Sequence, residues 1–95
     1  MTELRYTKQD VLDLNAEAWF KIMVEELKTL SAQFWNQRLS NDDRSRLQRA
    51  AELRNAGAVL VDADIRNVGE YDAPLVEDPF DPGRLVTIRH IERSR

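Results

Sequence analysis

The sequence predicts a mainly α-helical fold, in which an antiparallel two-helix hairpin is followed by an extended, proline-containing tail and one short C-terminal β-strand. Three observations predict it. Apolar residues recur at helical spacing through residues 7–39, and a second helix start follows at Ser40. All prolines lie beyond residue 73, where they disfavour further helix. An α+β fold is the alternative, because part of the second helix also alternates like a strand.

The first helix is predicted over residues 7–39. Thr7, with Asp10 three residues later, is suited to cap its first turn, and neither proline nor glycine occurs before Leu39. The apolar side chains are separated by three or four positions, so they fall on one narrow face of the helix. We expect this stripe to supply both the core and a self-association surface. It consists of Leu12, Ala16, Trp19, Met23, Leu27, Leu30 and Phe34.

Trp35 lies outside this stripe, about 140° from Leu12 on a helical projection. A tryptophan at a helix end has two common roles. It covers the core beneath another segment, or it anchors a partner. In a domain of this size we expect the tail to cover Trp35, and partner binding is the second role that the sequence supports.

The second helix is predicted to begin at residue 41. Ser40 or Asn41 can accept hydrogen bonds from the first-turn amides, and Asp42 and Asp43 complement the positive end of the helix dipole. Only a tight connection separates this start from the first helix. The two helices should therefore run antiparallel.

The sequence supports two different positions for the end of the second helix. An apolar spacing of three and four continues from Leu47 to Val68, which predicts a helix over residues 41–68. Residues 55–57 (Asn-Ala-Gly) instead resemble a helix end at 56, with an alternating strand at 58–66. We prefer the longer helix, because only that length covers an apolar stripe of about 33 Å.

The remainder of the chain is predicted to lack helix. Residues 70–83 form an extended acidic loop, whose prolines block helix formation. The loop ends in Asp-Pro-Gly, which predicts a type II turn with Gly83 at the positive-φ position. Residues 84–92 then have the pattern of a strand with apolar residues on both faces, so we expect this strand to be covered and to pair along an edge.

The chain is expected to form a single domain over residues 1–95, with a small core. Its net charge of −3 conceals a local bias, because acidic residues between positions 62 and 81 are opposed by Arg66 alone. We expect this acidic belt, together with Trp35, to dock a partner. The belt consists of Asp62, Asp64, Glu70, Asp72, Glu77, Asp78 and Asp81.

Residue patterns for catalysis or metal binding are scarce. The chain has one histidine, His90, no cysteine, and glycines that form no phosphate-binding loop. Asp62 and Asp64 would diverge by about 200° on a helix, and Asp78 and Asp81 lie among rigid prolines, so neither pair predicts a cation site. We therefore predict a protein that is not an enzyme and that binds no cofactor and no metal.

The predicted function is that of a small accessory or regulatory protein, which forms a homo-oligomer and docks an unidentified protein partner. No apolar run reaches the roughly 18–20 residues of a membrane span, and cysteines are absent, so we expect a cytoplasmic protein without a membrane segment. Nucleic-acid binding through the second helix is the alternative, and a pI of about 5.1 argues against it. An enzyme subunit is the third interpretation. The arginines that suggest nucleic-acid binding are Arg38, just before the second helix, and Arg44, Arg46, Arg49 and Arg54 within it.

Overall fold

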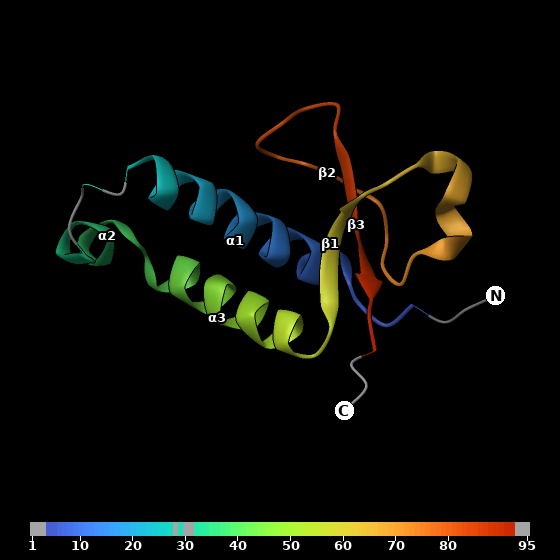
Figure 1. The fold of residues 1–95 in the computed structure, drawn as a ribbon, viewed down its shortest axis with the longest axis horizontal. Helices are drawn as coiled ribbons and strands as arrows, with labels where there is room; N and C mark the ends of the chain where they lie inside the picture. Colours follow the sequence, from blue (N-terminus) through green and yellow to red (C-terminus); the bar gives the residue numbers. More distant parts are fainter. Residues whose placement is uncertain (1–3, 28, 30–31, 93–95) are drawn as a thin grey trace.

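Three helices form an arm beside a small sheet in the computed structural model, which describes residues 4–27, 29 and 32–92. The helices are α1 (Lys8–Glu26), α2 (Ala32–Arg38) and α3 (Asn41–Asn55). In Figure 1, α1 and α3 lie side by side, run in opposite directions and extend away from the strands, with α2 at the far end. We call residues 8–18 and 48–55 the proximal half of this helical arm, and residues 19–27 and 32–47 its distal half.

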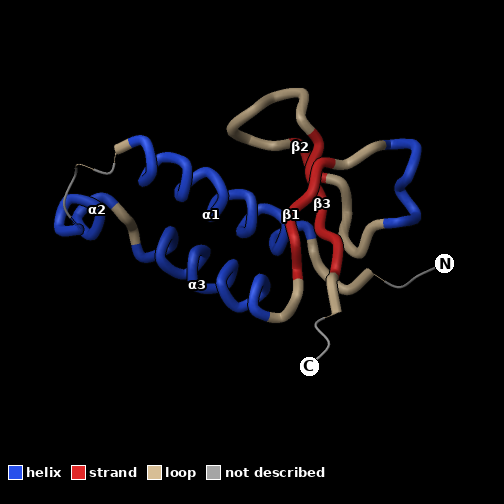
Figure 2. Tube along the Cα trace, in the orientation of Figure 1, coloured by secondary structure: helices blue, strands red, loops and turns tan. Residues whose placement is uncertain are grey.

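The sheet contains β1 (Ala58–Asp62), β2 (Val76–Glu77) and β3 (Leu85–His90) in the order β1-β3-β2. Both neighbours run antiparallel to β3. The short 3-10 helix η1 (Ile65–Glu70) lies between β1 and β2 in the chain. Figure 2 shows the strands gathered at one end of the arm. The fold is therefore mixed, with most regular structure in helices, and the prediction of a single strand is corrected to three strands.

Both long helices begin at capping boxes. Thr7 Oγ1 accepts a hydrogen bond from the Asp10 amide at 3.2 Å, and an Asp10 carboxylate oxygen accepts one from the Thr7 amide at 3.1 Å. Ser40 and Asp43 repeat this exchange at 3.1 and 3.2 Å. Each box satisfies two amides that a helix start leaves without intrahelical acceptors. The two helix starts expected from the sequence are confirmed.

The helix predicted without interruption over residues 7–39 is divided in the structure. α1 ends at Glu26, and α2 is a separate helix of 7 residues. Thr29 and Ser31 interrupt the run of strong helix formers, and such hydroxyl side chains compete with the helix for backbone groups. Leu30, one member of the predicted stripe, lies outside the described residues.

The preferred second helix, residues 41–68, is too long. α3 ends at Asn55, and the chain enters β1 through Gly57, whose φ of 104° is a conformation that glycine alone adopts readily. A Cβ at this position would overlap the carbonyl oxygen of Ile91. The alternative, a helix end near residue 56 followed by a strand, agrees with the structure, although β1 ends at Asp62. Hydrogen bonding to β3 stabilises the extended conformation of β1. The spacing of apolar residues within one segment contains no information about that pairing.

β3 lies inside the strand predicted at residues 84–92 and explains its two apolar faces. It is the central strand, paired with β1 on one side and β2 on the other. Val86 and Ile88 are fully buried on the side that contributes to the core, while Thr87 between them donates a hydrogen bond to the Ala73 carbonyl at 2.8 Å. Both faces of β3 are therefore covered by the chain itself.

The core lies where the proximal half of the arm packs against the sheet. Side chains from α1 and α3 meet side chains from all three strands and from the segment before β2. Such buried apolar side chains each stabilise the fold by about 1.5–3 kcal/mol. The core cluster consists of Val11, Leu14, Ala50, Leu53, Ala58, Ala73, Val76, Val86 and Ile88.

The predicted stripe is not the face of α1 that meets the sheet. Val11 and Leu14 occupy that face, whereas Leu12 borders the core. Ala16, Trp19 and Phe34 are half-buried. Met23 and Leu27 are 45% and 46% exposed, so the expectation that they belong to the core is wrong. The sheet reaches only the proximal half, and α3 alone is too narrow to cover the distal part of the stripe.

The molecule is more extended than its size requires. Its Cα radius of gyration is 14.5 Å, whereas a compact domain of 95 residues has about 12.4 Å. Its accessible surface is 6969 Å², whereas a folded protein of 11.1 kDa exposes about 5,700 Å². An arm that is covered by the sheet at only one end contributes to this difference, because Met23 and Leu27 in its distal half are 45% and 46% exposed.

Candidate functional site

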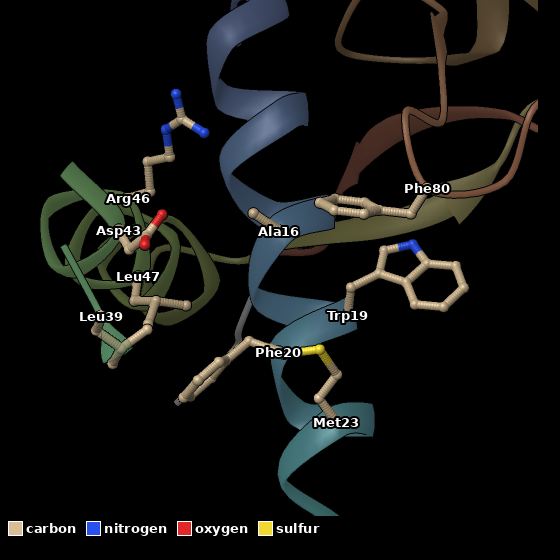
Figure 3. A pocket seen from close by; sticks show the side chains of 9 residues that line it. All are labelled: Ala16, Trp19, Phe20, Met23, Leu39, Asp43, Arg46, Leu47 and Phe80. Atoms are coloured by element: carbon tan, nitrogen blue, oxygen red, sulfur yellow. The ribbon is translucent and has the colours of Figure 1, made fainter. Parts of the chain in front are cut away.

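An apolar groove begins at Ala16 and continues along the distal half of the arm (Figure 3). Its volume is about 210 Å³. In Figure 3, Ala16 lies on α1 between side chains of α3 on one side and Phe80 on the other. The small Ala16 side chain lets another chain approach the α1 backbone closely. The lining residues are Ala16, Trp19, Phe20, Met23, Leu39, Asp43, Arg46, Leu47 and Phe80.

Trp19 and Phe80 form one wall of the groove. Their ring centroids lie 5.7 Å apart at an interplanar angle of 42°. Phe80 comes from the loop between β2 and β3 and is 56% exposed, which is unusual for a large apolar side chain in contact with another ring. The wall therefore presents aromatic surface that the chain itself does not bury.

Trp35 is half-buried by aromatic neighbours within the arm. Phe20 of α1 and Phe34 of α2 contact it in edge-to-face geometry, with centroid distances of 5.6 and 5.4 Å. Such pairs stabilise by about 0.5–1.5 kcal/mol beyond the area that they bury. Trp35 thus joins α2 to α1, and its ring contacts come from the arm, not from the tail as expected. Its role in partner binding stays a prediction.

The rim of the groove on α3 carries one charge of each sign. Asp43 and Arg46 lie one helical turn apart. Hydrogen bonds from the backbone and side chain of Ser40 hold the pKa of the Asp43 carboxyl below its ordinary value, and the nearby Arg46 guanidinium lowers it further. Asp43 is therefore an anion at neutral pH, and the rim has no net charge.

Asp78 anchors the loop that carries Phe80. Its carboxylate is fully buried and accepts hydrogen bonds from Asn15 Nδ2 at 2.9 Å, Trp19 Nε1 at 3.1 Å and the Phe80 amide at 2.8 Å. Arg84 adds a charged donor at 3.1 Å. These bonds connect the groove wall, the arm and the sheet through one carboxylate.

The hydrogen bonds decide the charge of Asp78. Burial alone would raise the pKa of its carboxyl, but donors from Asn15, Phe80, Trp19 and Arg84 outweigh burial and hold the pKa below its ordinary value. A hydrogen bond to Asp62 at 2.7 Å raises the pKa of Arg84 in turn. Asp78 is a structural anion, so its predicted exposure in the acidic belt is corrected.

Asp72, a second member of the predicted belt, organises backbone. Its carboxylate accepts a hydrogen bond from the His90 amide at 2.9 Å, and its carbonyl oxygen accepts from the Arg5 and Tyr6 amides at 3.0 and 3.1 Å. Asp72 thereby ties the N-terminal segment to β3. Like Asp78, it supports the fold and does not form part of a freely exposed acidic patch.

Most remaining acids of the belt have cationic neighbours. Asp64 pairs with Arg66 at 3.0 Å, Asp62 with Arg84 at 2.7 Å and Glu70 with Arg89 at 4.0 Å. Within the part of the chain that the structure describes, Asp72, Glu77 and Asp81 are the belt members without such a pair, and of these Glu77 and Asp81 are exposed. These two lie on either side of Phe80 in the chain. The belt is therefore dispersed, and its exposed unpaired members flank the groove wall.

Two arginines of α3 are engaged with α1. Arg49 lies 3.6 Å from Asp10, and Arg54 donates to the Glu17 carboxylate at 3.1 and 3.3 Å. Glu17 is 8% exposed and also lies 3.5 Å from Lys21. These pairs hold the two helices together, and they reduce the positive charge available to a nucleic-acid backbone.

The described residues contain no group of three or more His, Cys, Asp or Glu side chains that could hold a metal ion. His90 Nδ1 lies 2.6 Å from the Tyr6 hydroxyl, and burial is the main cause that raises the pKa of Tyr6. This bond attaches the N-terminal segment to β3. Across residues 4–27, 29 and 32–92, no helix combines the length and apolar character needed to cross a bilayer.

Four apolar residues of the groove lie outside the predicted stripe: Phe20, Leu39, Leu47 and Phe80. Phe20 was identifiable, because it follows Ala16 by four positions and precedes Met23 by three. Phe80 carries no such signal. Its position depends on Asp78, whose burial is set by contacts more than 55 residues away in sequence, to Asn15 and Trp19.

Comparison with known proteins gives no functional guide: no family model matches the chain, and no match was found among curated proteins or solved structures. Functional inference therefore starts from the groove itself.

Proposed function

We propose that this protein is a non-catalytic interaction protein, whose groove receives the apolar face of a helix from a protein partner. The observation that carries the proposal is the gathering of exposed apolar side chains around the groove. Ile22, Met23, Leu27 and Phe80 are between 45% and 56% exposed. Exposed apolar groups gathered in this way mark binding surfaces, because water contact with them is unfavourable.

A helix is the supported ligand because the α1 side of the groove has helical periodicity. Ala16, Phe20 and Met23 line it at separations of four and three, and the exposed Leu27 follows four residues after Met23. This spacing is that of the seam along which two helices interlock side chains. The small Ala16 at one end and the aromatic wall of Trp19 and Phe80 beside it supply a hole and a knob for such packing.

The unpaired acids Glu77 and Asp81 have a secondary role in this proposal. They flank Phe80 in the chain and are exposed, Glu77 at the end of β2 and Asp81 in the loop that follows. Exposed charges at the edge of an interface mainly raise the association rate and select orientation, and they add little affinity. This role replaces docking by the whole acidic belt, because most of its members are paired within the chain.

Site-specific photo-crosslinking tests the proposal. A benzophenone amino acid at the exposed Ile22, the residue before the groove-lining Met23, should form covalent adducts with protein, either in the purified sample or in extracts of the source cells. The same group at Ile65, which is 70% exposed in η1 at the other end of the molecule, is the matched control. Adducts should form at position 22 and be lost with Leu27→Lys. Equal labelling at both positions, or none at position 22, contradicts the proposal.

A further inference from the structure

We infer that the helix received by the groove belongs to a second copy of this chain, so that the distal halves of two arms pack about a two-fold axis as a four-helix bundle. This inference rests on the proposed function and names its partner. It is carried by three independent features: the surface area of the chain, the arrangement of the helices, and the charges at the groove rim.

The surface area matches the requirement of a dimer. The chain exposes about 1,300 Å² more than a compact protein of its mass. Each partner in a standard stable interface buries about 800 Å². An interface of this size would remove more than half of the excess area of each chain.

The helices are arranged as half of a bundle. α1 and α3 run antiparallel, and four-helix bundles consist of two such pairs with their apolar faces inward. In the monomer, Met23 and Leu27 are 45% and 46% exposed, so the described part of the chain covers them only in part. Met23 lies at the middle of residues 19–27, the distal part of α1 with its C-cap, so a two-fold axis near this residue places it beside Met23 of the partner subunit.

The rim is suited to pair with itself. In a two-fold interface, residue i of one copy contacts residue j of the other, and the reverse contact follows. The groove rim carries Asp43 and Arg46 on α3. Both signs are thus present on the same surface, which lets the basic group of one copy approach an acidic group of the other. A strongly acidic or basic partner would leave one sign unmatched.

Equilibrium sedimentation between about 1 and 300 µM tests the inference, since it spans typical weak-to-moderate dimer affinities. The wild type should approach twice 11.1 kDa at high concentration. Met23→Lys should raise the dimer dissociation constant at least about 30-fold, because each dimer would then bury two ammonium groups. Ile65→Lys, the matched control, should leave the constant unchanged within about twofold. Met23 is about half exposed in the monomer, so its variant should fold.

Disulfide trapping locates the axis independently. The chain contains no cysteine, so a single Met23→Cys variant reports on one contact. Mild oxidation should convert it to a covalent dimer faster than Ile65→Cys at the same concentration. A wild-type mass of 11.1 kDa at every concentration overturns the inference, as does equal trapping of the two cysteine variants. If the chain is monomeric but position 22 still crosslinks to another protein, the inference fails while the proposed function stands. If neither occurs, both fail.

Discussion

The proximal and distal halves of the helical arm have similar amphipathic sequences and opposite environments. In the proximal half, Val11 and Leu14 are 0% and 5% exposed beneath the sheet. In the distal half, Met23 and Leu27 of the same helix are 45% and 46% exposed. Helical periodicity is present in both. The difference teaches that amphipathic spacing predicts the existence of an apolar face, and that the reach of neighbouring elements decides whether the same chain covers it.

The two halves meet at a buried polar network instead of a continuous apolar core. Asn15 is fully buried and donates to Asp78, while its Oδ1 finds no hydrogen-bond partner among the described residues. A buried acceptor left without a donor costs about 1–3 kcal/mol. The same network fixes the position of the loop that carries Phe80. The unsatisfied Asn15 oxygen therefore lowers the stability of the fold at the point where the groove begins.

Shortening one apolar side chain in each half to alanine should show the largest difference between the two halves. Leu14→Ala should lower the free energy of unfolding by about 3–4 kcal/mol, because it leaves a cavity between α1 and the sheet. Met23→Ala should cost less than about 1 kcal/mol in the monomer, since that side chain is already half exposed. Urea denaturation at low micromolar concentration measures both. Similar losses at the two positions would show that the distal half is as well covered as the proximal half.

Asp78→Asn should cost about 2–4 kcal/mol, because it removes the charge that Arg84 and the other donors surround. The folded-state pKa of Asp78 lies below that of an unfolded aspartate, about 3.9. Its contribution is therefore complete above about pH 5 and is lost as the pH falls through the lowered folded pKa. Chemical denaturation between pH 2 and 7 should give a shallower acid dependence for the variant. If the free energy of unfolding of the variant depended on pH as steeply as that of the wild type, the Asp78 carboxylate would not be the group that links the two halves.

Gly57→Ala tests the junction between α3 and β1. The new Cβ would overlap the Ile91 carbonyl oxygen and would hold alanine at positive φ, so we expect a loss of at least about 2 kcal/mol. Gly69→Ala is the matched control, because nothing lies within 4 Å of its Cβ position. Thermal unfolding should show a lower melting temperature for the first variant only. A tolerated Gly57→Ala would mean that the arm does not depend on this close approach to β3.

The smallest effect is expected from the unpaired acids beside the groove wall. Glu77→Gln combined with Asp81→Asn should change the free energy of unfolding by less than about 0.5 kcal/mol, because both side chains are solvated. The same change should speed dimer association at low salt and weaken its salt dependence, because each copy carries a net charge of −3 and the variant reduces the repulsion between two copies. Stopped-flow mixing across ionic strengths measures this. If the variant associated at the wild-type rate at every salt concentration, Glu77 and Asp81 would have no part in recognition, and the apolar groove alone would form the recognition surface.

Local signals in the sequence identified the parts of the fold that depend on short-range chemistry. The capping boxes at Thr7 and Ser40 are visible because both partners lie within three residues. Gly83 has a φ of 94°, and the Arg84 amide donates to the Asp81 carbonyl, as expected for the predicted turn. β3 was placed correctly because its length and bordering turn are local properties. These features need no knowledge of the rest of the chain.

The end of α3 was misjudged for a physical reason. Residues after Gly57 fit both a helical and an alternating pattern, so their local preferences nearly balance. The pairing of β1 with β3, from Ala58 with His90 to Asp62 with Val86, decides between them. Those partners lie more than 20 residues apart, and the energy of a long-range ladder is absent from any local window.

By itself the sequence determined where helices begin, where glycine permits a turn, and that one helix face is apolar, because these properties follow from hydrogen bonds and side-chain spacing within one or two turns. Only the tertiary structure decided which face of α1 meets the sheet, which acids are paired, and that Asp78 is buried beneath Asn15 and Trp19. Burial and pairing depend on groups that are distant in the chain and close in space. The same rule leaves the distal half of the arm exposed, since the sheet that covers Leu14 ends before it reaches Met23.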